Sequence, residues 1–181
     1  KEGLEADDIL GTIAKRMERE GTEVTIVSGD RDLLQLATEH IKIRMPRTVK
    51  GKTEVEDYYA KDVLAKYQVT PPQIIELKAL MGDASDNIPG VPKVGEKTAT
   101  SLIVEYGTIE NLKEHIDEIK KKSIRETLTE HFDLAVLSKK LATINTDGEI
   151  AYDLTDAAIG NLYTKEAYAY MKRLGFKNMM S

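Results

Sequence analysis

Helical and strand patterns alternate over the first 45 residues, and this alternation restricts the fold more than any other feature of the sequence. Apolar residues recur at helical spacing over residues 5–20, and Gly21 follows as a stop signal. The β-branched run Val24–Val27 predicts a buried strand. A short helix over residues 33–36 and a strand over residues 41–45 come next. The order helix, strand, helix, strand predicts an α/β protein with a parallel sheet.

This sheet is expected to be incomplete. Only two or three strands can be identified, whereas a parallel sheet normally has more strands and is covered by helices on both faces. The chain begins without a Met, and helical patterning starts within a few residues of Lys1. We therefore expect an α/β core that lacks its N-terminal side, with further strands encoded upstream of Lys1.

The remainder of the chain is predicted to be mainly helical. Residues 82–95 form a loop rich in Gly, Pro, Asp and Asn. We expect one continuous domain, with the α/β portion over residues 1–81 and a helical portion over residues 82–181. The predicted helices cover residues 60–67, 71–81, 96–105, 108–119, 123–144 and 165–174.

Composition excludes several classes of site. The chain has 26 Lys and Arg against 31 Asp and Glu, which argues against binding of nucleic acid by bulk positive charge. Because there is no Cys, disulfides and thiolate metal sites are excluded, and a hard cation held by oxygen is favoured. No apolar run approaches the ~18 residues of a membrane span, so an intracellular setting without membrane partners is the default expectation.

Two basic stretches have ordinary structural interpretations. The residues between Lys42 and Lys52 favour a solvated strand and loop over a DNA contact. The run Lys120–Lys122 lies between predicted helices, where we interpret it as a helix end whose charge complements the dipole.

Three acidic clusters are the candidate functional groups. Each cluster alone has a structural explanation as a helix cap or a turn. In an open parallel sheet, however, strand ends and the loops beyond them meet at one edge, where ligands bind. The clusters comprise Glu5, Asp7 and Asp8 at a helix start, Asp30 and Asp32 after the first strand, and Asp83 and Asp86 in the Gly/Pro loop.

Convergence of these carboxylates would require a cation. Like charges in one site repel, and Mg²⁺ or Mn²⁺ is the hard ion that carboxylates hold best. Several carboxylates can hold two ions about 3.5–4 Å apart, an arrangement that suits phosphodiester hydrolysis. A calcium loop beginning at Asp83 is the rival interpretation, but Ile88 stands where an EF-hand needs Gly and Val94 where it needs Glu.

The segment Gly90–Gly95, followed by Lys97, is a tight loop that opens a helix. A simple helix–helix turn would explain it. Free N–H groups at a helix start, a close glycine backbone and nearby lysines also suit phosphate, and phosphate contacts hold DNA without reading its sequence. We favour phosphate binding over the simple turn.

Three segments carry a resemblance to a known family. They are Gly3–Ile9 (GLEADDI), Ser28–Gln35 (SGDRDLLQ) and Gly82–Pro92 (GDASDNIPGVP). In order and spacing they resemble motifs of the 5'-3' exonuclease (flap endonuclease) domain of bacterial DNA polymerase I. The likeness extends to Leu174–Phe176 and so covers essentially the whole chain.

This resemblance implies a PIN-like nuclease core, followed by a mainly helical half with a helix-hairpin-helix element. It implies hydrolysis of a phosphodiester bond near a 5' end or at the base of a 5' flap, in primer removal, nick translation and DNA repair in the bacterial cytoplasm. It also implies two Mg²⁺ or Mn²⁺ ions. The implied metal ligands are Glu5, Asp7, Asp8, Asp30, Asp32, Asp83 and Asp86, all but the first of which are also the implied catalytic residues.

The family's hairpin binds the backbone of a 5'-flap, nicked or RNA-primed duplex and often holds K⁺ with loop carbonyls. Lys93 stands where the family usually has Gly. The implied DNA-binding residues are Gly90, Val91, Lys93, Val94, Gly95, Lys97 and Thr98.

Family members carry two further aspartates and a basic gateway before the segment that matches Gly3, and a polymerase domain downstream. We therefore expect the 181 residues alone to be inactive. The alternative hypothesis is a non-catalytic module that binds duplex DNA by its structure.

Overall fold

The computed structural model describes residues 3–153 and 155–179. The chain divides into two compact units, residues 1–148 and residues 149–181, and each is described by itself.

The first unit begins with the predicted alternation. Helix α1 (Ala6–Arg19) is followed by strand β1 (Val24–Val27), the 3-10 helix η1 (Asp32–Leu36) and strand β2 (Ile41–Val49). Strands β1 and β2 pair in parallel, and Val24 lies opposite Ile41. The predicted α/β class and its parallel pairing are confirmed.

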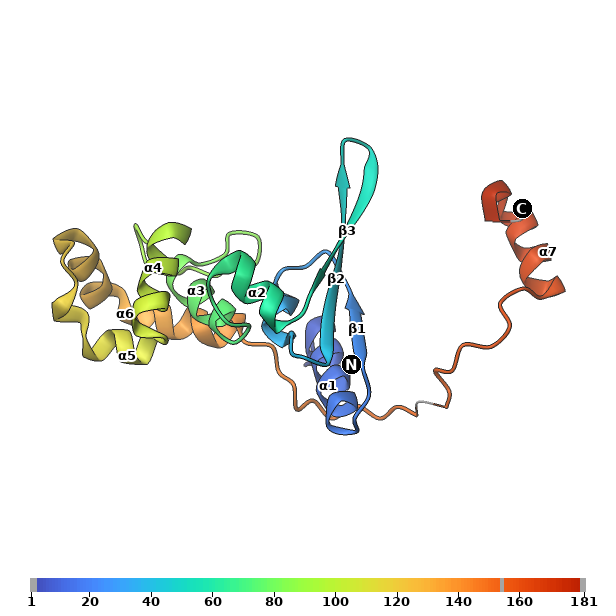
Figure 1. Ribbon diagram of the computed structural model, residues 1–181, viewed down its shortest axis with the longest axis horizontal. Helices are drawn as coiled ribbons and strands as arrows, with labels where there is room; N and C mark the ends of the chain where they lie inside the picture. The colour runs from blue at the N-terminus through green and yellow to red at the C-terminus, as the bar shows by residue number, and fades with distance from the viewer. Residues whose placement is uncertain (1–2, 154, 180–181) are drawn as a thin grey trace. The chain divides into compact units, whose positions relative to one another are not determined.

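A third strand, β3 (Lys52–Tyr58), was not predicted. It pairs antiparallel with β2, so the sheet of the described residues is mixed, in the order β1-β2-β3. The two strands form a ribbon that extends away from the helices of this unit (Figure 1). The solvated strand predicted within Lys42–Lys52 is confirmed, but a turn at Lys50 and Gly51 then leads into this further strand.

Charge pairs hold this ribbon together, which explains why β3 lacks an apolar alternation. Tyr58 is its one buried residue. Arg44 donates from Nε and Nη2 to the two carboxylate oxygens of Asp57 at 2.8 and 2.7 Å. The Glu56 carboxylate accepts from Lys66 Nζ at 2.8 Å.

Helices make up the rest of the first unit and confirm the predicted positions to within a few residues. The predicted helix over residues 108–119 is split into two short helices, and the long helix α6 is kinked at His131. The elements are α2 (Ala60–Tyr67), α3 (Gln73–Met81), α4 (Glu96–Tyr106), α5 (Ile109–Glu114), η2 (Ile116–Glu118) and α6 (Lys122–Ala142).

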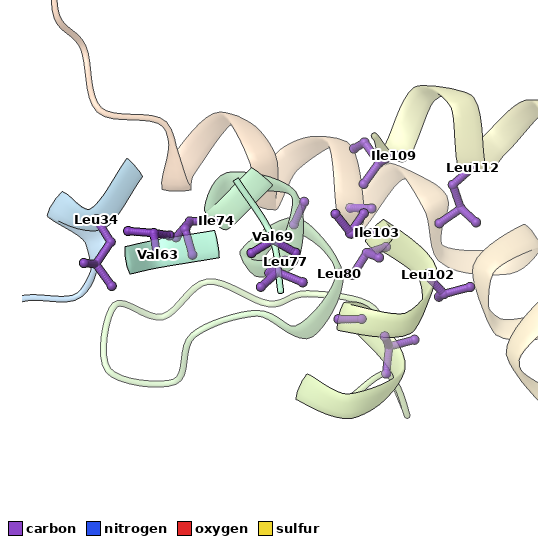
Figure 2. Packing of buried hydrophobic residues seen from close by; sticks show 14 of the residues in the cluster. Leu34, Val63, Val69, Ile74, Leu77, Leu80, Leu102, Ile103, Ile109 and Leu112 are labelled. Carbon is purple, nitrogen blue, oxygen red and sulfur yellow. The ribbon is translucent and has the colours of Figure 1, made fainter. Parts of the chain in front are cut away.

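Helix α3 is the centre of the helical packing. It contacts η1, α4, α5 and α6, and its Leu77 and Leu80 lie in the core (Figure 2). Two charged residues, Glu76 and Lys78, are also buried on this helix. Because burying an unpaired charge is very unfavourable, both require partners. Glu76 accepts from the backbone N–H of Ile109 at 3.0 Å and from Lys139 Nζ at 2.6 Å.

A close backbone contact fixes the loop after α3. Gly82 and Gly90 have φ of 72° and 60°, in the left-handed region. A Cβ on Gly82 would lie 2.6 Å from the carbonyl oxygen of Ile88, and a Cβ on Gly90 would overlap the backbone of Gly82. Glycine at both positions therefore lets the start of the hairpin pack directly against the end of α3.

The second unit contains α7 (Lys165–Leu174) and the short η3 (Lys177–Met179). The predicted helix over residues 165–174 is confirmed. Among the described residues, no helix is both long and apolar enough to cross a membrane.

Acidification is expected to weaken the β2–β3 ribbon. The hydrogen bonds from Arg44 of β2 lower the pKa of Asp57 to about 2. Those from Lys66 of α2 lower the pKa of Glu56 to about 2 and join β3 to that helix. Both values lie below those of unfolded chains, about 3.9 and 4.3, so this stabilisation is present above about pH 4 and is lost as the pH falls towards 2.

Cross-strand NOEs between β2 and β3, followed by NMR from pH 6 to pH 2, check this expectation. The NOEs should weaken between about pH 4 and pH 2 and before the signals of α6 change. An Arg44→Met control should weaken the ribbon already at pH 6. Cross-strand NOEs that persist undiminished at pH 2 would contradict the charge-pair account.

Candidate metal centre and nucleic-acid interface

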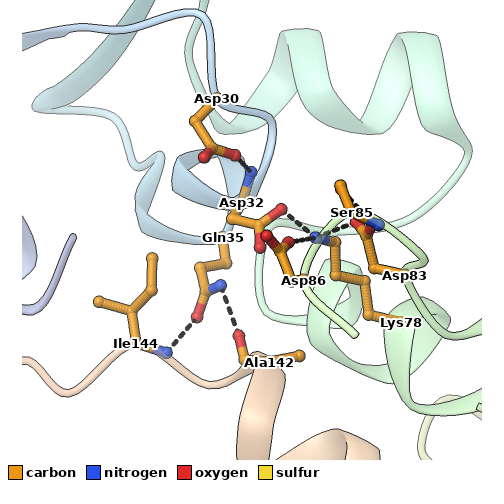
Figure 3. Close-up of polar contacts among 9 residues, drawn as sticks. All are labelled: Asp30, Asp32, Gln35, Lys78, Asp83, Ser85, Asp86, Ala142 and Ile144. Carbon is orange, nitrogen blue, oxygen red and sulfur yellow. Dashed lines mark hydrogen bonds and ion pairs between the residues drawn. The ribbon is translucent and has the colours of Figure 1, made fainter. Parts of the chain in front are cut away.

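Three of the predicted acidic residues converge in space. Asp32 begins η1, just after the loop that follows β1, and Asp83 and Asp86 lie in the loop after α3. One carboxylate oxygen of each residue lies within 4.8 Å of the other two (Figure 3). Residues more than 50 positions apart thus form one anionic group at the end of β1, as the sequence predicted.

A buried lysine lies among these carboxylates, and the sequence analysis missed it. The Nζ of Lys78 donates to Asp32, donates to Asp83 at 2.7 Å and lies 3.7 Å from Asp86. The Lys78 side chain is 6% exposed. It falls in an apolar helical segment, where a single lysine resembles an exposed surface residue, so no sequence signal identified it.

The environment shifts the titration of this group. Burial raises the pKa of Asp32, although its hydrogen bond with Lys78 acts in the opposite direction. Hydrogen bonds from Lys78 and Ser85 hold the pKa of Asp83 well below its usual range. Burial alone would lower the pKa of Lys78, but its bonds to Asp32 and Asp83 raise it. Lys78 is therefore a cation at neutral pH.

Two further predicted ligands lie beside this triad. Burial raises the pKa of Asp7, and the negative charges of Asp30 and Asp32 raise it further, which places these groups within electrostatic range of one another. The Asp30 carboxylate accepts from the backbone N–H of Asp32 at 2.9 Å, and this contact orders the loop after β1.

Glu5 and Asp8 have structural contacts. They form a reciprocal capping box at the start of α1, in which the Asp8 carboxylate accepts from the backbone N–H of Glu5 at 3.1 Å. The other Asp8 oxygen accepts from the backbone N–H of Asn145 at 2.8 Å. Both Asp8 oxygens therefore have backbone donors, and neither residue is part of the triad.

The triad fits a divalent cation. Its donors are all carboxylate oxygens, which suit Mg²⁺ and Mn²⁺. Three carboxylates against the one positive charge of Lys78 leave an excess of about two negative charges, which one divalent ion would neutralise. The triad also lines a cavity of about 540 Å³, so a ligand can reach it; the rest of the lining is mixed and includes apolar Leu34 and Leu77 as well as charged Arg31 and Glu96.

The predicted DNA-binding hairpin has a buried and an exposed part. Val91 and Val94 are each 3% exposed and anchor the loop in the core. The backbone N–H of Gly90 donates to the Ser138 hydroxyl at 2.9 Å. These contacts fix the loop, whereas Lys93, Gly95 and Lys97 are exposed and Thr98 is partly exposed.

Helix α4 begins at this loop, with Gly95 as its N-cap. The first backbone N–H groups of any helix lack intrahelical acceptors, and its N-terminus carries partial positive charge. Lys97 and Thr98 share a groove of about 310 Å³ with Ser101 and Lys121. This arrangement of hydroxyls and ammonium groups is suited to phosphate.

The interpretation of Lys120–Lys122 as a helix end with a favourable dipole is wrong. Lys121 is the N-cap of α6 and Lys122 its first residue, so these positive charges lie at the positive end of that helix. Their placement is electrostatically unfavourable for α6 and adds positive potential to the groove beside Lys97. Sequence periodicity alone did not locate the helix start accurately enough to show this.

Two substitutions in the hairpin should change stability in opposite directions. Gly90→Ala should lower the free energy of unfolding by about 2–4 kcal/mol, because the added Cβ is strained and overlaps the backbone of Gly82. Lys93 has φ of 66°, a left-handed conformation that glycine adopts more easily. Lys93→Gly should therefore raise the free energy of unfolding by about 0.5–1 kcal/mol.

Urea denaturation measures both changes. Gly95→Ser is the matched control, because Gly95 has φ of −94° and open space around it, and it should be near neutral. Lys93→Ala separates the backbone from the charge, since it removes the ammonium and keeps the strain. A Lys93→Gly variant less stable than wild type would contradict this account of the loop.

Two family descriptions match consecutive parts of the chain. Residues 1–68 match "5'-3' exonuclease, N-terminal resolvase-like domain", and residues 69–165 match "5'-3' exonuclease, C-terminal SAM fold". Together they extend across the sheet, the acidic triad and the hairpin.

Curated relatives include bacterial polymerases. The chain is 49% identical to DNA polymerase I of Bacillus caldotenax over 99% of its length and 47% identical to that of Bacillus subtilis over 99%. It spans 20% of the length of each of these relatives.

Solved structures share the fold. T5 5'-exonuclease with bound divalent zinc ions is similar with a TM-score of 0.67 and 28% identity, over 80% of this chain and 51% of that one. A bacteriophage T5 D15 flap endonuclease complex with DNA and metal ions has a TM-score of 0.64 and 27% identity over 80% and 51%. The catalytic core of Rad2 with DNA substrate is similar in fold, with a TM-score of 0.62 and 22% identity over 93% and 56%.

Proposed function

Because the chain belongs to the 5'-3' exonuclease family, we propose that it is the nuclease part of a bacterial DNA polymerase I. The reaction is metal-dependent hydrolysis of a phosphodiester bond near a 5' end or at the base of a 5' flap. Its uses would be primer removal, nick translation and repair.

The convergence of Asp32, Asp83 and Asp86 is the observation that carries this proposal. Two separate chain segments supply these carboxylates, and the cavity beside them is open to a ligand. Lys78 supplies one positive charge against three carboxylates, so the group keeps excess negative charge. A divalent ion is the simplest partner for that excess.

The side chains would divide the work as follows. Asp32, Asp83 and Asp86 hold one Mg²⁺ or Mn²⁺, and Asp7 and Asp30 hold a second ion beside it. When bound, the ions would supply a nucleophile from water at neutral pH and stabilise charge on the leaving oxygen. Glu5 and Asp8 also belong to the predicted ligand set, but their capping contacts favour a supporting role at the start of α1.

The hairpin and the start of α4 would hold one backbone of the duplex. Exposed Lys93 and Lys97 supply charge, and the helix N-terminus supplies N–H donors. Such contacts position DNA without reading its sequence, which suits recognition of a nick or a flap by its structure. A K⁺ ion at the loop carbonyls remains a prediction. The Pro92 carbonyl accepts from the Thr127 hydroxyl at 3.0 Å, so other carbonyls would have to hold it.

The full enzyme would include more than these residues, since the curated relatives are about five times longer. We propose that an upstream portion completes the sheet and the metal shell, and that a polymerase domain follows. The protein would act in the cytoplasm on the chromosome. The predicted division at residues 81 and 82, which places Asp32 in the first portion and Asp83, Asp86 and the hairpin in the second, is likewise a proposal.

Replacing the ligands tests the catalytic role. In a chain extended by its upstream segment, Asp83→Asn and Asp32→Asn should each lower the cleavage rate of a 5'-flap substrate with Mg²⁺ by about 100-fold or more, because the cation loses a charged ligand. Asp133, exposed on α6, provides the control, and Asp133→Asn should cleave normally.

DNA affinity, measured on the same variants, should be unchanged or higher. Cleavage that survives Asp83→Asn would favour the non-catalytic DNA-binding module. The 181-residue chain alone should be inactive, and robust flap cleavage by it would overturn the proposed need for the upstream portion.

A second test addresses the hairpin. Lys97→Ala should weaken binding of duplex DNA for all sequences alike. It should also reduce the slope of log Kd against log salt concentration by about one, the value for one phosphate contact. Fluorescence anisotropy at several salt concentrations measures both. Lys61→Ala on α2 is the matched control, because Lys61 is exposed and lies outside the groove. Equal loss of affinity in both variants would indicate bulk charge instead of a hairpin contact.

A further inference from the structure

The side chain of Lys78 places a positive charge among the three carboxylates of the acidic triad. Its Nζ contacts Asp32 and Asp83 as a hydrogen-bond donor and lies 3.7 Å from Asp86. Among the residues that the structure describes, no other lysine or arginine lies within ion-pair distance of these carboxylates. The ammonium therefore lies in the same electrostatic position that a divalent ion at the triad would require.

A second lysine in the same unit shows what an ordinary buried ion pair looks like here. Lys139 Nζ lies 2.6 Å from Glu76 and 2.8 Å from Glu110, so it too bridges carboxylates of two helices. None of Lys139, Glu76 and Glu110 lines the cavity beside the triad. Lys78 differs from Lys139 in having three acidic neighbours, a nearly complete burial and a cavity beside it.

We propose that Lys78 is a positioning residue that holds Asp32, Asp83 and Asp86 together before a divalent ion binds and weakens the binding of that ion. The proposal deepens the proposed function and rests on it, because it takes the triad to be a metal site. The first effect follows from attraction between one ammonium and three carboxylates. The second follows from repulsion between that ammonium and an incoming cation.

Two properties of the centre follow. The carboxylates are gathered without metal, so an ion meets preorganised ligands and little of its binding energy is used to order them. The ion is also held less tightly than three carboxylates alone would hold it, so it can exchange. Without Lys78 the metal-free triad would repel itself, but an ion would bind to a more negative site.

Lys78→Met tests both effects, since methionine approximates the length of the side chain and lacks the charge. Lys139→Met is the matched control. In the 181-residue chain, thermal unfolding with EDTA measures the metal-free fold, and Mn²⁺ titration followed by EPR measures the dissociation constant. A merely structural lysine would change the first quantity and leave the second unchanged.

The two variants should behave differently. Lys78→Met should lower the metal-free Tm and tighten Mn²⁺ binding at least tenfold, equivalent to about 1.4 kcal/mol. Lys139→Met should lower the Tm and leave Mn²⁺ binding unchanged. Lys78→Arg keeps the charge and should bind Mn²⁺ no more tightly than wild type.

Failure of the inference can be told from failure of the proposed function. Wild-type chain that binds Mn²⁺, combined with Lys78→Met that binds it equally or more weakly, overturns the inference alone. Wild-type chain that binds no Mn²⁺ overturns the inference, whereas the proposed function is overturned only if the chain extended by its upstream segment also fails to cleave the flap.

If Lys78→Met does not fold, an NMR measurement on the wild-type chain tests the proposal instead. The ¹H–¹⁵N signal of the Lys78 ammonium should shift on addition of Mg²⁺ while that of Lys139 does not. An unmoved Lys78 signal at saturating Mg²⁺ would overturn the proposal.

Discussion

The interaction between the Lys78 ammonium and the carboxylates of Asp32 and Asp83 joins the two parts of the candidate centre. Asp32 belongs to the segment after β1, and Asp83 belongs to the loop after α3. Without an internal cation, carboxylates from these segments would repel each other. A buried charge on α3 therefore stabilises the metal-free arrangement in which the sheet edge and the helical loop share one site. Gln35 strengthens this connection, because its amide bonds to Ala142 and Ile144 tie η1 to the end of α6 (Figure 3).

Helix α3 also connects the acidic triad to the nucleic-acid interface. Its last turn carries Lys78, and the backbone of Leu80 accepts from the N–H of Val91 in the hairpin at 2.7 Å. The close approach of Gly82 and Gly90 follows directly after it along the chain. A duplex held at the hairpin would thus be held at a fixed distance from the carboxylates, because backbone contacts join the hairpin to the end of α3. This rigid connection is what a nuclease that measures the position of a 5' end requires.

Sequence alone predicted most of the fold and part of the site. The parallel pair β1 and β2, the main helices and the convergence of Asp32 with Asp83 and Asp86 followed from periodicity and from the rule that strand ends share an edge. Strand β3 was not predicted, because ion pairs such as Arg44–Asp57 replace the apolar alternation that marks a strand in the sequence. Lys78 was not predicted as a site residue, because a lysine in a helical pattern is expected to be exposed. Only tertiary packing shows that this one is buried. The contacts of Asp8 with Asn145 depend on residues 137 positions apart, which no local pattern encodes.

The proposed role of the triad around Lys78 as a divalent-metal site can be tested on the bound metal itself. Anomalous X-ray diffraction from crystals of the chain grown with MnCl₂ tests it most directly, since manganese is located without reference to activity. The account predicts an anomalous peak within coordination distance, about 2.0–2.6 Å, of oxygens of Asp32, Asp83 and Asp86. It also predicts that Lys78 Nζ lies beside the ion and does not coordinate it. Manganese bound elsewhere, with the triad holding only Lys78 at saturating metal, would contradict it.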